Sequence, residues 1–125
     1  MKEQTHDFLD GKGPVPSHIH TKGGGWVANT TNVHNSAYIG PDARVYGNAW
    51  VFGDAWVSGD ARVYCDARVY GNAWVSGNAR VYGDARVHGD ARVHGDARVY
   101  GDAWVYDDAR VYGDARPHHH RGKER

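Results

Sequence analysis

A six-residue repeat runs through most of the chain and restricts the folds that it can adopt. Residues 83–100 read GDARVHGDARVHGDARVY, which is three nearly identical hexads end to end. Valine or isoleucine occupies fifteen positions spaced six apart, from Val27 to Val111, without insertion or deletion. Alanine follows four residues later from Ala37 to Ala115, and Thr31 stands in its place in the first hexad. A helix requires an apolar period near 3.6, so this spacing argues against helices.

Each hexad predicts one short strand followed by one corner. Side chains alternate along a strand, so in Arg-Val-Tyr the valine points inward and its neighbours point outward. Glycine with aspartate or asparagine accepts the left-handed backbone of a corner, and the alanine beside it fills little inward space. Three sides close a triangle of 18 residues, so fifteen hexads predict about five coils stacked roughly 4.8 Å apart.

The repeat divides the chain into three predicted segments. Residues 1–25 are an N-terminal cap or extension, residues 26–116 are the repeat domain, and residues 117–125 are a flexible tail. Phe8 and Leu9 are the best candidates to plug one open end of the core. Pro117 stands where the next valine is due, and it ends the ladder because proline has no backbone donor.

The word Val-Tyr-Gly-Asp-Ala-Arg resembles the hexapeptide repeat of left-handed parallel β-helix proteins. The resemblance implies an all-β fold, a single-stranded left-handed triangular parallel β-helix of about five 18-residue coils. The left-handed sense comes from the family, because parallel crossovers are ordinarily right-handed. The family includes trimeric acyltransferases and carbonic anhydrase-like enzymes, together with uninterrupted repeat proteins, some from phage, without assigned chemistry. The opening GGGWVANTTNVHNSAYIGPDARVYGNA looks like the second kind.

Outward residues spaced 18 apart line up in columns, and one face joins arginines with tyrosines. We interpret this face as a candidate platform for a flat or anionic partner, because guanidinium planes stack on one another and on rings. The alternative is a solvated surface on which corner aspartates neutralise the arginines. The platform residues are Arg62, Tyr64, Arg80, Tyr82, Arg98 and Tyr100.

Tryptophan residues indicate an oligomer interface. Trp50, Trp56 and Trp74 cannot point into a valine and alanine interior, and large exposed rings mark interfaces. Ser58 and Ser76 are small and leave space beside them for a neighbouring chain. The resemblance implies trimers, so we expect a homotrimer. In the alternative interpretation the rings only cover their own coil.

Histidine residues suggest a metal site. His18 and His20 are two apart, so they face one side of an extended segment. Three such pairs in a trimer would supply six imidazoles, which suits a transition metal such as iron or nickel. The alternative is an ordinary polar loop.

Catalysis has weaker support in the sequence. Acyltransferases of the resembling family use a histidine base and a covering loop, and His34, His88 and His94 are the histidines on the coil sides. The hexads leave no room for such a loop, and neither a Ser-His-Asp order nor a phosphate loop occurs. We therefore expect a non-enzymatic structural or binding prism, acting as a rigid spacer, a spike-like element or an interaction platform. The alternative is an acyltransferase-like enzyme or a small-ligand-sequestering protein that uses grooves between subunits.

Composition restricts partners and location. Lysine plus arginine and aspartate plus glutamate are both 15, so zero net charge argues against a nucleic-acid partner. The one cysteine, Cys65, excludes an internal disulfide. No apolar run is long enough for a signal peptide or a membrane span, so we expect no membrane partner and a cytoplasmic or virion-associated protein.

Overall fold

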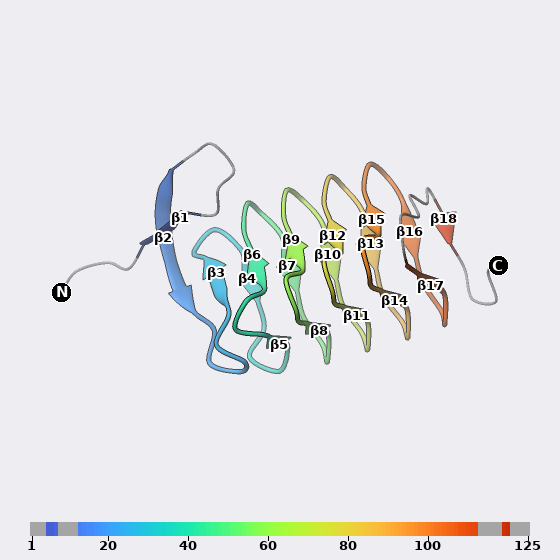
Figure 1. The fold of residues 1–125 in the computed structure, drawn as a ribbon, viewed down its shortest axis with the longest axis horizontal. Helices are drawn as coiled ribbons and strands as arrows, with labels where there is room; N and C mark the ends of the chain where they lie inside the picture. The colour runs from blue at the N-terminus through green and yellow to red at the C-terminus, as the bar shows by residue number, and fades with distance from the viewer. Residues whose placement is uncertain (1–4, 8–12, 113–118, 121–125) are drawn as a thin grey trace.

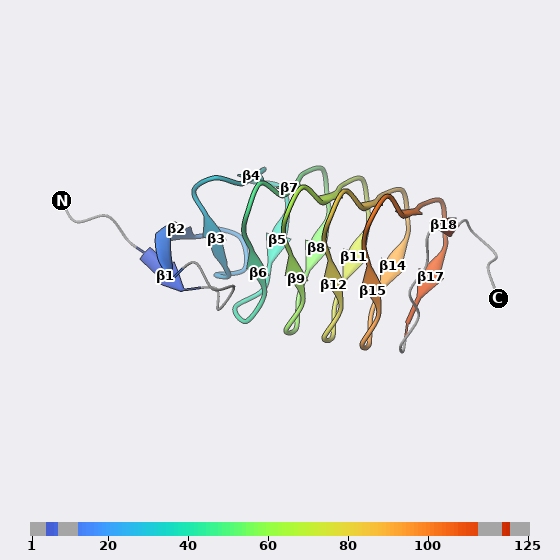
Figure 2. The same cartoon turned by 90° about the horizontal axis from the view of Figure 1, so that it is seen from above.

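The computed structural model describes residues 5–7, 13–112 and 119–120 and shows a stack of triangular coils (Figures 1 and 2). Each side of a triangle is a two-residue strand, and a corner separates it from the next side. Every third strand pairs in parallel with the strand one coil further along. The chain is therefore an all-β parallel solenoid of about five coils with three sheets, which confirms the predicted architecture. Its left-handed sense stays a prediction from the resemblance.

Three sheets form the sides of the prism, and each contains strands spaced 18 residues apart. The first contains β1 (Thr5–Asp7), β2 (Pro14–Ile19), β3 (Trp26–Ala28), β6 (Arg44–Val45), β9 (Arg62–Val63), β12 (Arg80–Val81) and β15 (Arg98–Val99). The second contains β4 (Asn32–Val33), β7 (Trp50–Val51), β10 (Arg68–Val69), β13 (Arg86–Val87), β16 (Trp104–Val105) and β18 (His119–His120). The third contains β5 (Tyr38–Ile39), β8 (Trp56–Val57), β11 (Trp74–Val75), β14 (Arg92–Val93) and β17 (Arg110–Val111).

One backbone pattern joins successive coils. The amide of Arg44 donates to the carbonyl of Ala61 at 3.0 Å, and the amide of Tyr64 donates to the carbonyl of Val81 at 3.0 Å. Both bonds join residue i to residue i+17, and the pattern recurs along the stack. Because each hexad has the same length, the register never shifts, and Arg68 lies level with Trp50 on one side and Arg86 on the other.

Valine and alanine fill the interior as the hexads predict. The inward valines from Val45 to Val105 and the alanines from Ala49 to Ala109 are 0% exposed. Ile39 joins this core, and Val33, near the N-terminal end, is only partly buried against it. A carbon core of such small side chains leaves the rings of tryptophan and tyrosine outside.

Glycine is required at corners where successive coils approach closely. Gly83 has a φ of 69°, and a Cβ placed there would lie 2.8 Å from the backbone nitrogen of Gly101 in the next coil. Cys65 adopts the same left-handed conformation, with a φ of 61°, at the position that glycine holds in most hexads. The corners therefore combine a local requirement for positive φ with a contact between coils.

The N-terminal part differs from the coils. Strand β1 pairs antiparallel with β2, and β2 pairs antiparallel with β3, with His18 opposite Val27. Strand β18 pairs in parallel with β16 near the other end. The proposed plug residues Phe8 and Leu9 lie outside the described residues, as do Arg116 and Pro117.

Across residues 5–7, 13–112 and 119–120, no helix has the length and apolar character needed to cross a membrane.

Candidate functional site

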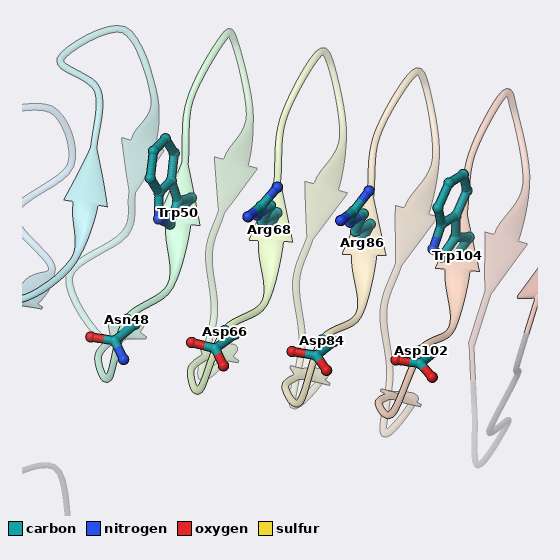
Figure 3. Close-up of a pocket in the computed structure, with 8 residues that line it drawn as sticks. All are labelled: Asn48, Trp50, Asp66, Arg68, Asp84, Arg86, Asp102 and Trp104. Carbon is teal, nitrogen blue, oxygen red and sulfur yellow. The ribbon is translucent and has the colours of Figure 1, made fainter.

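Each face of the prism carries a shallow groove between two rows of polar side chains, and the groove on the second sheet is the largest, at about 490 Å³. Figure 3 shows one row at the corners and another on the strands, both parallel to the axis of the stack. The corner row is Asn48, Asp66, Asp84 and Asp102, and the strand row is Trp50, Arg68, Arg86 and Trp104.

The two rows follow from the order of residues in each hexad. An aspartate or asparagine at the corner is followed by a buried alanine and then by the first, outward residue of the strand. Since the register is fixed, every coil adds one side chain to each row. The corner acids were considered in the sequence only as neutralising charges, yet the 18-residue count is sufficient to align them.

Arginine and tryptophan stack along the strand row of this groove. The guanidinium carbon of Arg68 lies 5.6 Å from the ring centroid of Trp50, and that of Arg86 lies 5.3 Å from the ring centroid of Trp104. The two tryptophans therefore enclose two cations. Such contacts favour the guanidinium group by roughly 0.5–1 kcal/mol at exposed sites.

Two further grooves repeat this design. The third sheet has a groove of about 350 Å³, which Asn72, Trp74, Asp90, Arg92, Asp108 and Arg110 line. The first sheet has one of about 300 Å³, which Asp42, Arg44, Asp60, Arg62, Asn78 and Arg80 line. All three grooves present carboxylate and guanidinium groups, and these lining residues include no hydroxyl, thiol or imidazole.

The six predicted platform residues come together on the first sheet. Arg62, Arg80 and Arg98 are level with one another in successive coils. Beside them the rings of Tyr64 and Tyr82 stack with centroids 4.9 Å apart, and the ring of Tyr100 continues the ladder at 5.3 Å from that of Tyr82.

The tyrosine ladder is partly dry. Burial raises the pKa of Tyr64, and the neighbouring rings Tyr46 and Tyr82 raise it further. The phenol therefore keeps its proton at neutral pH, and the ladder presents ring edges and hydroxyl groups to a partner. Its use as a platform stays a prediction.

The predicted interface residues divide between two sheets. Trp56 and Trp74 stack on the third sheet with centroids 5.4 Å apart, and Trp50 lies on the second sheet. Ser58 and Ser76 are partly buried next to the third-sheet rings.

Exposure supports attention to the same surfaces. Trp50 is 43% exposed and Trp74 is 44% exposed. Trp104, which was not singled out from the sequence, is 41% exposed on the same sheet as Trp50. Its place follows from counting 54 residues, or three coils, onward from Trp50.

His18 and His20 have different surroundings. His18 is exposed, and its Nδ1 lies 2.6 Å from Oδ1 of Asn29. His20 is 3% exposed, and its Nε2 lies 2.7 Å from the carbonyl oxygen of Ala37, so it donates there. A metal at this pair stays a prediction, and His20 would have to offer its other ring nitrogen. Within the described part of the chain, no three His, Cys, Asp or Glu side chains are grouped to hold a metal ion.

His88 stacks in a column of rings on the second sheet. Its centroid is 4.8 Å from that of Tyr70 and 5.6 Å from that of Tyr106. Burial lowers the pKa of His88, Arg86 also lowers it, and Asp107 opposes them. The imidazole is therefore neutral at pH 7 and takes the place of a tyrosine ring in the stack.

Comparison with known proteins agrees with this repeat geometry. Residues 43–59, 67–79, 73–89, 79–95 and 91–107 match the family model described as YdcK Beta solenoid repeat. No curated protein and no solved structure matches the chain. The coils of this parallel β-solenoid thus carry repeats of the YdcK beta-solenoid repeat family.

Proposed function

We propose that the prism is a non-enzymatic structural or binding element that assembles side by side as a homotrimer. The observation that carries this proposal is the exposure of tryptophan on two sheets that share a corner. Trp50 on β7 and Trp56 on β8 are separated only by the corner residues 52–55. Large exposed rings of this kind are favoured at interfaces, where they bury much surface.

Two different faces favour a closed ring over an isolated pair. When one copy uses its second sheet against the third sheet of the next copy, the contact is head-to-tail, and such contacts close into rings. The small side chains of Ser58 and Ser76 leave room beside Trp56 and Trp74 for the neighbouring chain. The first sheet, with its arginine and tyrosine ladders, then faces outward as the interaction platform.

A rigid, non-catalytic role agrees with the regular coils. The described strands from β3 to β17 follow one another with no inserted loop that could cover a groove. The resemblance to uninterrupted hexapeptide-repeat proteins, some from phage, supports a spacer or spike-like element in the cytoplasm or on a virion. An acyltransferase-like enzyme would instead need a base beside a covered groove.

Light scattering tests the proposal. We expect a mass three times that of the 13.8 kDa chain for the unaltered protein. Replacing Trp56 and Trp74 together by serine should lower this mass toward that of one chain. The matched control replaces Tyr64 and Tyr82, which also stack on each other but lie on the first sheet, and should leave the mass unchanged. A single-chain mass for the unaltered protein would refute the trimer.

A further inference from the structure

The N-terminal end of the third sheet has a backbone edge that is complementary to the opposite end of the same sheet. In every coil, the carbonyls of the inward alanine and valine accept amides from 17 residues earlier, as in Tyr38 N to Ala55 O and Gly40 N to Val57 O. Strand β5 is the first strand of this sheet among the described residues. No earlier coil supplies amides to the carbonyls of Ala37 and Ile39, so another group must do so.

The segment His20–Gly25 supplies those partners. The amide of Gly25 donates to the carbonyl of Ile39 at 2.9 Å, and the amide of Ile39 donates to the carbonyl of Lys22 at 3.0 Å. Nε2 of His20 donates to the carbonyl of Ala37 at 2.7 Å. The polar groups along the edge of β5 are thus satisfied by this segment, which we call the plug.

His20 takes the part of a backbone amide in the plug. Under the i+17 pattern, the carbonyl of Ala37 would accept the amide of residue 20. The chain turns away instead, because the amide of His20 donates to the carbonyl of Gly25 at 2.8 Å. The imidazole of the same residue replaces it on Ala37, and it is buried in doing so. A buried imidazole in this position is explained by the edge that it covers.

Glycines let the plug lie close against β5. A Cβ at Gly23 would lie 2.1 Å from the carbonyl oxygen of Ile39. A Cβ at Gly25 would lie 2.3 Å from the carbonyl oxygen of Gly40 and 2.5 Å from Cγ2 of Ile39. Side chains at either position would lift the segment off the edge.

Strand β17 lies at the other end of this sheet. The carbonyls of Ala109 and Val111 already accept the amides of Arg92 and His94 at 2.9 Å. In the same pattern the amides of Arg110 and Tyr112 therefore point along the axis, away from the stack. Figure 1 shows β17 near one end of the molecule and the N-terminal strands at the other. These two donors have the spacing of the two acceptors, Ala37 and Ile39.

We propose that the plug blocks head-to-tail stacking of the solenoid, and that the occupant it excludes is β17 of a second copy. With the plug displaced, Arg110 and Tyr112 of one copy would donate to Ala37 and Ile39 of the next, which continues the ladder without a break. A head-to-tail contact of this kind does not close, so it generates a filament along the axis. This inference concerns the ends of the prism and is independent of the lateral trimer proposed above.

The test uses the full chain with point variants in the plug. His20→Ala removes the imidazole donor, and Gly25→Ala forces the segment away from β5. The controls are His18→Ala, which removes an exposed ring bonded to Asn29, and Gly24→Ala, where a Cβ meets nothing within 4 Å. We expect both plug variants, and neither control, to form filaments seen by electron microscopy. Hydrogen exchange at the amide of Gly25 should accelerate in the same two variants.

A second substitution identifies the excluded strand. Tyr112→Pro removes a donor from β17, so in the Gly25→Ala background it should abolish the filaments while circular dichroism stays β-like. Plug variants that keep both the coil spectrum and the mass of the unaltered protein would overturn the proposal. Filaments that persist after Tyr112→Pro would overturn the assignment of β17. A monomeric but filament-forming variant would contradict only the trimer.

Discussion

The guanidinium carbon of Arg68 lies 5.6 Å from the ring centroid of Trp50, one coil away on the second sheet. Because the register is fixed by the backbone, neither side chain has to be ordered by the contact alone. The pair therefore measures how much an outward column adds to a solenoid whose core is only valine and alanine.

We predict a coupling energy of about 0.5–1 kcal/mol between these two side chains. It would be measured in a double-mutant cycle of Trp50→Ala, Arg68→Ala and the combined variant, using chemical denaturation. The control cycle pairs Trp50 with Arg86, which is two coils away and should give additive effects. A coupling energy of zero in the first cycle would show that the column is a solvated surface with no net stacking.

Val81→Asp should unfold the stack. Val81 is 0% exposed within a core of valine and alanine, and a carboxylate there would have no partner. Its cost is on the order of 5 kcal/mol, which is a large part of the stability of a small domain. Thermal melting followed by circular dichroism checks this, with the exposed corner substitution Asp84→Asn in the same coil as control. Unchanged melting of Val81→Asp would contradict the inward placement of the valines.

Corner glycines should differ according to what lies over them. Gly83→Ala and Gly101→Ala both place alanine at a positive φ, which costs about 1–2 kcal/mol. A Cβ at Gly83 also meets the backbone of Gly101 at 2.8 Å, whereas one at Gly101 meets nothing within 4 Å. We therefore expect Gly83→Ala to be the more destabilising, by a margin that denaturant titration would measure. Equal losses would mean that the coils separate easily at their corners.

The repeat made the coils predictable, because one hexad length fixes the register of every later strand. The inward position of Val81, the alignment of Arg62 with Arg80 and the separation of Trp50 from Trp56 all follow from counting by 18. The N-terminal segment has no such period. That His20 covers the carbonyl of Ala37 depends on the turn through Gly23–Gly25 and on a missing coil, and no local pattern shows either. The same pair of histidines therefore suggested a metal site.

Acid should weaken the fold through His88. Burial between Tyr70 and Tyr106 lowers the pKa of this imidazole, with Arg86 acting in the same direction and Asp107 against it. The folded pKa is thus below the unfolded value, which is near 6.5. The unfolded chain binds the proton more readily, so this contribution to stability is complete above pH 6.5 and is lost as pH falls through the folded pKa. The Nε2 atom is buried without a hydrogen-bond partner, so a proton placed there would gain no acceptor. His88→Tyr restores the ring that most hexads place there and removes the titration. We expect the free energy of unfolding to fall less between pH 7 and pH 5 for His88→Tyr than for the unaltered protein. His94→Tyr, at the equivalent outward position on the third sheet, serves as the control and should retain the pH dependence of the unaltered protein. If the unaltered protein and His88→Tyr lose the same free energy over this range, the acid sensitivity comes from the other histidines.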